Sequence, residues 1–141
     1  MTTIIGIDPG RRTGIAIYRD AALYELRTVS PEQIESVLVE VRPGLVVFED
    51  SRKQSAVFIR GTNARSMLKI ARNVGEIDQL CRQIEAHCDV LGIRCQLVSP
   101  RPKGRKLGAA AFSALRGWPG RSNQHERDAA LVAWPYRRGC T

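Results

Sequence analysis

Four side chains of metal-binding type stand where secondary structure is expected to begin or end. Asp8 and Glu49 each close a short apolar run, and His125 and Asp128 lie three residues apart near the C-terminus. Clustered carboxylates repel one another unless cations lie between them, and oxygen-rich sites favour Mg²⁺ or Mn²⁺. A pair of such ions activates water and stabilises the leaving 3′ oxygen in phosphodiester hydrolysis. The set therefore predicts a two-metal catalytic site in which Asp8, Glu49, His125 and Asp128 are the ligands.

Each of these residues has a simpler explanation when it is taken alone. Asp8 and Glu49 would then be turn-forming or exposed acids, and Asp128 would stabilise the first turns of a helix through the helix dipole. The spacing of His125 and Asp128 puts them on one helical face, but such pairs are common. The coincidence of four such groups at the ends of elements favours the metal site. A Walker A phosphate loop at residues 10–14 is excluded, because no Gly-Lys-Ser/Thr follows.

Strands are predicted to carry the two acids at their ends. The first three have β-type spacing with turn residues between them, which predicts an antiparallel meander. The apolar run before Glu49 is continuous, as expected for a strand that is buried on both faces. The expected strands are residues 3–8, 13–18, 23–28, 45–48 and 93–98.

Helices are predicted to cover this sheet. Ser30 and Gln33 have the spacing of a capping box at the start of the first helix. The longest helix begins at Thr62 or Asn63 and keeps apolar residues at steps of three and four until Gly92. The expected helices are residues 31–42, 63–91, 107–115 and 124–134, with a basic loop at 100–106 and a turn at 116–123. Together the elements predict one domain, residues 1–141, with a mixed sheet of three antiparallel strands followed by parallel strands.

The charge balance points to nucleic acid as a partner. The formal net charge is +8, and all but four of the 22 basic residues are arginine. Arginine suits bidentate phosphate contact, although a basic soluble surface explains composition equally well. The candidates for DNA contact lie beside the acids and in the basic loop: Arg11, Arg12, Arg52, Lys53, Lys103, Arg105 and Lys106. Phe58, before the long helix, is either a side chain that inserts against bases or a core residue.

The cysteines and the N-terminus indicate an intracellular protein. Cys81, Cys88, Cys95 and Cys140 include no C-x-x-C pair, so buried thiols are expected rather than zinc ligands or disulfides. The start of the chain lacks a basic and apolar leader, and no apolar stretch approaches the roughly 20 residues of a membrane span. The expectation is a cytoplasmic protein.

Three motifs together resemble a known family. They are Ile5-Gly6-Ile7-Asp8-Pro9-Gly10 with Thr13-Gly14, then Val47-Phe48-Glu49, then His125-x-x-Asp128-Ala129-Ala130. Their order and spacing resemble the RuvC-type Holliday junction resolvases, including shorter phage-like members, across nearly the whole chain. The resemblance implies a ribonuclease H-like fold, a homodimer, dependence on Mg²⁺ and paired nicks across a four-way DNA junction. It also implies a bacterial protein, or a phage protein in the host cytoplasm.

The resemblance carries the four metal-site roles to Asp8, Glu49, His125 and Asp128. Some members of the family have Asp where this chain has His125, so His125 either binds metal directly or assists with water. Strand alternation puts Asp50 on the opposite face from Glu49. Because a four-way junction is two-fold symmetric, a C2 dimer is expected, and the long helix is the candidate interface. Met67 and Leu68 widen its apolar surface beyond one stripe, although all these residues could serve the monomer core.

Other functions remain open from the sequence. YqgF-type proteins, which are associated with ribosomal RNA processing, begin with a similar Asp motif, but their later signatures are not present. Actin-like ATPases and sugar kinases share the opening fold, but they need a second domain, for which 141 residues leave no room. A junction-binding module without catalysis is the third alternative, and the four candidate ligands argue against it.

Overall fold

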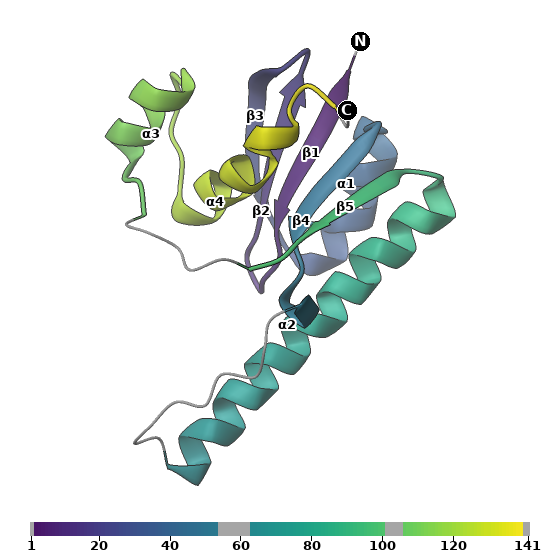
Figure 1. Ribbon diagram of the computed structural model, residues 1–141, viewed down its shortest axis with the longest axis vertical. Helices are drawn as coiled ribbons and strands as arrows, with labels where there is room; N and C mark the ends of the chain where they lie inside the picture. Colours follow the sequence, from purple (N-terminus) through teal and green to yellow (C-terminus); the bar gives the residue numbers. More distant parts are fainter. Residues whose placement is uncertain (1, 54–62, 101–105, 140–141) are drawn as a thin grey trace.

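Five strands form one mixed sheet in the computed structural model, which describes residues 2–53, 63–100 and 106–139 (Figure 1). β1 (Thr3–Asp8), β2 (Thr13–Arg19) and β3 (Ala22–Val29) form an antiparallel meander. β4 (Leu45–Glu49) lies parallel to β1, and β5 (Arg94–Val98) lies parallel to β4. The order β3-β2-β1-β4-β5 confirms the predicted sheet of three antiparallel strands followed by parallel ones.

Helices follow the strands largely where the sequence predicts them. They are η1 (Pro31–Gln33), α1 (Ile34–Val41), η2 (Ser51–Lys53), α2 (Ala64–Leu91), α3 (Ala109–Arg116), α4 (Gln124–Ala133) and η3 (Trp134–Tyr136). The first predicted helix is divided into a 3₁₀ turn, η1, and the α-helix α1. The side chain of Gln33 accepts a hydrogen bond from the Ser30 N–H at 2.9 Å, as the capping-box spacing predicts.

The sheet separates two hydrophobic cores, because alternate side chains along each strand point to opposite faces. On one face, Ile7 of β1 and Phe48 of β4 pack with α1 and α2. On the other face, Ile4 and Val47 pack with α4, and Phe112 of α3 joins the same core. Figure 1 shows α4 on one side of the sheet and α1 with α2 on the other. Each end of a central strand can therefore present a side chain to either layer.

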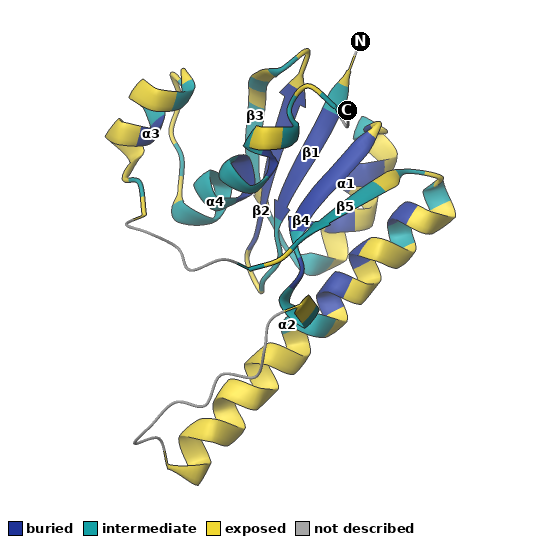
Figure 2. Ribbon diagram, in the orientation of Figure 1, coloured by how far each residue is buried: buried dark blue, intermediate teal, exposed yellow. Residues whose placement is uncertain are grey.

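Helix α2 has a packed half and a projecting half. Asn63 caps its start, where its side chain accepts a hydrogen bond from the Ser66 N–H at 2.8 Å, and Gly92 ends it in a left-handed conformation with φ 68°. Residues 63–76 are all exposed, whereas Leu80, Cys81, Ile84 and Cys88 in the second half are buried. Figure 2 shows the first half as an exposed rod that extends beyond the sheet. Packing on the sheet therefore stabilises little more than half of the helix.

The cysteine prediction is confirmed for the described part of the chain. Cys81 and Cys88 are buried and Cys95 is half-buried, and these three are free thiols; Cys140 lies outside the described residues. Within the same residues, no helix combines the length and the apolarity that a membrane span requires.

Candidate active site

Asp8 and Glu49 end neighbouring parallel strands on the same face of the sheet. The register pairs Ile7 of β1 with Phe48 of β4, so that the two acids are the next residues along each strand. Ile7 and Phe48 belong to the core under α1 and α2. Because side chains alternate, Asp8 and Glu49 take the opposite face, which α4 covers. The sheet therefore brings the two predicted carboxylates to one edge.

Two glycines allow α4 to lie directly on the strands beside these acids. A Cβ atom at Gly6 would overlap the backbone carbonyl of Ala129, and one at Gly14 would overlap the backbone carbonyl of His125. Ala129, Ala130 and Ala133 are buried, so small side chains line the helix side of the same contact. The Thr-Gly and Ala-Ala parts of the sequence motifs thus fix the distance between helix and sheet.

Polar contacts hold α4 in position. The Tyr18 hydroxyl donates a hydrogen bond to the carbonyl of Ala130 at 2.6 Å, and burial raises the pKa of Tyr18, which keeps this donor protonated. At the helix start, Asn123 accepts from the Glu126 N–H at 2.9 Å, and Glu126 accepts from the Asn123 N–H at 3.0 Å. Thr28 of β3 donates to Glu126 at 3.0 Å, which ties this cap to the sheet.

His125, in the first turn of α4, contacts Asp8. Its Nδ1 lies 3.3 Å from Oδ2 of Asp8, and the two side chains are 45% and 23% exposed. Residues 117 positions apart in the sequence thus form one pair that solvent reaches. An imidazole next to a carboxylate can donate a proton to it, bind metal beside it or orient water.

Asp128 lies on the same helix with other partners. Its Oδ2 is 3.2 Å from Nζ of Lys106, and its Oδ1 accepts a hydrogen bond from Gln124 at 2.9 Å. Among the residues that the structure describes, no three His, Cys, Asp or Glu side chains form a group that could hold a metal ion. In type, three carboxylates and an imidazole suit Mg²⁺ or Mn²⁺. In the protein alone, however, Lys106 supplies the positive charge beside Asp128.

Asp50 lies on the opposite face from Glu49, as strand alternation predicts. Its side chain is 3% exposed and accepts hydrogen bonds from Arg52 Nε at 2.8 Å and Nη2 at 2.9 Å. These bonds, chiefly, lower the pKa of Asp50. Arg52 also reaches Glu85 of α2 at 3.3 Å. Its guanidinium therefore joins η2 to α2, and a DNA contact by Arg52 stays a prediction.

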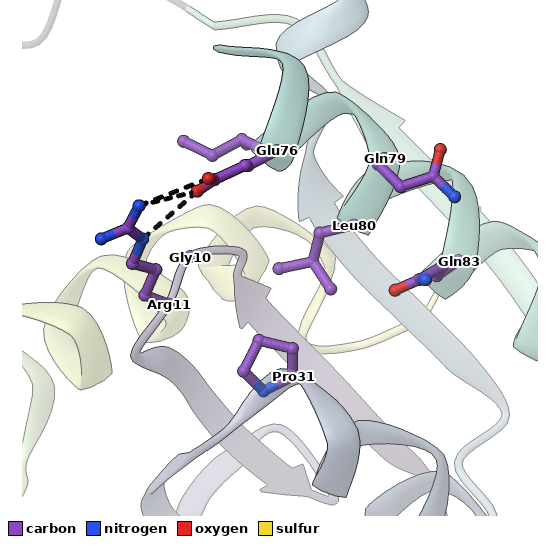
Figure 3. Close-up of a pocket in the computed structure, with 8 residues that line it drawn as sticks. Gly10, Arg11, Pro31, Glu76, Gln79, Leu80 and Gln83 are labelled. Atoms are coloured by element: carbon purple, nitrogen blue, oxygen red, sulfur yellow. Dashed lines mark hydrogen bonds and ion pairs between the residues drawn. The ribbon is translucent and has the colours of Figure 1, made fainter. Parts of the chain in front are cut away.

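The other predicted DNA-binding residues are placed as follows. Arg11 is paired with Glu76 of α2 at 3.1 Å, and Figure 3 shows this pair where the Gly10–Arg11 loop meets the helix. Arg12 is exposed, and Lys53 Nζ lies 3.4 Å from the carbonyl of Leu97. Lys103, Arg105 and Phe58 lie outside the described residues.

Solved structures with this fold come from RuvC. The ribonuclease H-like fold predicted from the motifs is confirmed by two Thermus thermophilus RuvC structures, one of them in complex with a Holliday junction substrate. The complex has a TM-score of 0.65 at 16% identity, with 96% of this chain and 92% of that chain covered. The other has a TM-score of 0.64 at 15% identity, with 96% and 93% covered. No protein-family model and no curated protein matches this chain. The resemblance to RuvC-type resolvases therefore holds for the fold.

Proposed function

We propose that this protein is a metal-dependent endonuclease that resolves branched DNA, above all four-way junctions, by paired nicks. The observation that carries the proposal is the contact of His125 with Asp8 at the strand edge where Glu49 also ends. A sequence-distant imidazole and two strand-end acids on one face need a shared ligand to justify their mutual cost. The RuvC likeness supports a nuclease, because one of those RuvC structures holds a Holliday junction substrate.

Asp8, Glu49, His125 and Asp128 would hold two Mg²⁺ ions, or Mn²⁺ in their place. Bound there, the ions would supply an activated water and stabilise the leaving 3′ oxygen of the phosphodiester. The chain's own part is to position these side chains on the rigid ends of β1 and β4 and on α4. Lys106 offsets the charge of Asp128 in the free protein, and would be free to meet a phosphate when that carboxylate turns to metal.

A homodimer would supply the second nick, since each chain offers one such edge. Helix α2 supports this arrangement, because its apolar stripe runs past the sheet. Met67, Ile70 and Val74 are 41%, 39% and 46% exposed and continue the three- and four-residue spacing of the buried residues. Two such stripes in an isologous contact would bury each other. We therefore place the dimer interface on the projecting half of α2.

The test uses a synthetic four-way junction and a linear duplex of the same arm sequence. Incubation with Mg²⁺ should produce symmetric nicks in the junction and leave the duplex intact, and EDTA should stop the reaction. Asp8→Asn should bind the junction as well as wild type and fail to cut it. Nicking by Asp8→Asn at the wild-type rate would show that the site is elsewhere.

A junction-binding module without catalysis is the second candidate. One observation favours it: within the described residues no three ligand side chains are grouped for a metal ion. Tight junction binding without nicks in either Mg²⁺ or Mn²⁺ would support this function. A YqgF-like RNA-processing nuclease would instead cut a structured RNA in preference to the DNA junction, so an RNA substrate belongs in the same assay.

A further inference from the structure

The projecting half of α2 has a cationic face opposite its apolar stripe. Arg65, Lys69 and Arg72 follow one another at steps of four and three residues, which places them on one side of the helix. Met67, Ile70 and Val74, by the same periodicity, lie on the other side. Residues 63–75 contain no acidic residue, so the three cations have no carboxylate on their own part of the helix.

Helix stability does not explain this charge. The positive end of the helix dipole is at the N-terminus, where acids are favourable and cations are unfavourable by about 0.3–1 kcal/mol each. The first turn of α2 contains no acid, and Arg65 is its second residue. The packed half of the same helix has the reverse balance, with Glu76, Asp78, Glu85 and Asp89 against Arg82. The cations therefore stand where a partner, rather than the helix, would favour them.

The cationic face continues toward the candidate active site. Arg11, three residues after Asp8, shares an open groove of about 690 Å³ with Arg65, Lys69 and Arg72. The three helix cations span about 10 Å along the axis at 1.5 Å per residue. One DNA strand presents a phosphate every 3.4 Å or so along the duplex. The groove thus has the length and the charge to follow about three successive phosphates.

We propose that Arg65, Lys69, Arg72 and Arg11 form a binding surface for the phosphate backbone of one duplex arm of the DNA substrate. The choice of DNA over another polyanion rests on the proposed function. The apolar stripe on the opposite side of α2 stays available to a second copy of the chain. The helix therefore binds a backbone with one face while the other serves the dimer.

The experiment compares two triple variants that lose the same charge. Arg65→Gln, Lys69→Gln and Arg72→Gln remove the cationic face. Arg42→Gln, Arg82→Gln and Arg94→Gln remove three exposed cations from the other half of α2 and from the ends of the sheet where β4 and β5 begin. Affinity for the four-way junction is measured in EDTA from about 0.05 to 0.3 M salt, so that no cutting enters. Circular dichroism and sedimentation of each variant follow folding and oligomeric state.

The arm variant should lose about 2.7 from the slope of log affinity against log salt, or about 0.9 for each phosphate contact. Its affinity should fall at least about tenfold at 0.1 M salt, whereas the control variant should stay close to wild type. The charge-preserving variant Arg65→Lys, Lys69→Arg and Arg72→Lys should retain the wild-type slope. Equal slopes for the arm and control variants would overturn the proposal, and so would a slope change that accompanies loss of the dimer.

This result is independent of the nuclease proposal. If wild type binds the junction with a steep salt dependence that the arm variant flattens, the surface stands even when no cutting occurs in Mg²⁺. If wild type cuts the junction and the arm variant binds and cuts as well as wild type, the nuclease stands and the surface is elsewhere.

Discussion

Glu49 and Asp50 are adjacent in the sequence, but the two faces of the sheet give them opposite surroundings. Glu49 ends β4 on the face that α4 covers, beside Asp8 and within reach of solvent. Asp50 turns to the other face, where it is buried and held by Arg52. One face thus keeps its carboxylates for a ligand, and the other consumes its carboxylate in an internal ion pair. A site needs acids whose charge the fold has not neutralised.

The packing of the two faces differs in the same sense. Gly6 and Gly14, with the alanines of α4, bring helix backbone against strand backbone on the site face. On the other face, large aliphatic side chains such as Ile7 and Ile84 separate the sheet from α2. Close backbone packing leaves little room for adjustment, whereas aliphatic layers tolerate volume-conserving changes. The site face is therefore expected to be the less tolerant of substitution.

The largest expected effect is on catalysis and comes from the site face. Glu49→Gln and Asp8→Asn should reduce junction cutting to background, because each removes a carboxylate that would hold metal. Junction affinity should be unchanged or higher, since negative charge facing phosphate is lost. The free energy of unfolding should change by no more than about 0.5 kcal/mol. Nicking assays and gel shifts measure the first two, and urea unfolding measures the third.

The next effect concerns the close contact of α4 with the strands. Gly14→Ala should lower the free energy of unfolding by about 3 kcal/mol, near the upper end for overpacking, because the new Cβ meets the His125 backbone. Cutting should fall with it, since His125 moves. Gly75→Ala is the matched control: nothing lies within 4 Å of its Cβ position in α2. It should raise stability by about 0.5–1 kcal/mol, as alanine is the better helix former.

The sequence predicted much of this difference between faces and missed its physical basis. Alternation along β4 was enough to assign Glu49 and Asp50 to opposite faces, because a strand has a period of two. The ion pair of Asp50 with Arg52 joins residues two apart, but only the burial of the turn makes it strong. The need for glycine at Gly14 depends on α4, more than a hundred residues later. Local patterns do not contain such a contact.

The projecting half of α2 was also beyond the sequence. Its apolar spacing continues without a break from the packed half, so the pattern predicted one helix with one buried stripe. Burial depends on where the sheet ends, and the exposed Met67, Ile70 and Val74 lie past that point. The cations Arg65, Lys69 and Arg72 were not among the predicted DNA contacts, although their spacing and the absence of acids nearby were readable signals.

A smaller effect is expected from the internal carboxylate. Asp50→Asn should lower the free energy of unfolding at pH 7 by about 1–2 kcal/mol, because Arg52 loses charge-assisted hydrogen bonds. The fold lowers the pKa of Asp50, so its stabilisation is present above the unfolded pKa of about 3.9. That stabilisation is lost as the pH falls through the folded pKa. The gap between wild type and variant should therefore shrink in acid, which urea unfolding between pH 7 and pH 3 would measure. Cutting per folded molecule at pH 7 should be retained, in contrast to Glu49→Gln.

The smallest effect on stability is expected where the site loop meets α2, at the ion pair of Arg11 with Glu76. The two side chains are 81% and 55% exposed, so a double-mutant cycle with Arg11→Gln and Glu76→Gln should give a coupling energy of about 0.2–1 kcal/mol. Their effects on DNA should have opposite signs. Arg11→Gln removes a cation that lies between the acids and the α2 groove, and it should weaken junction binding. Glu76→Gln frees Arg11 from a competing carboxylate, and it should strengthen binding most at low salt. Junction affinity in EDTA at two salt concentrations tests both signs. If the two variants weaken binding equally, Arg11 acts through its hold on α2 and not through contact with phosphate.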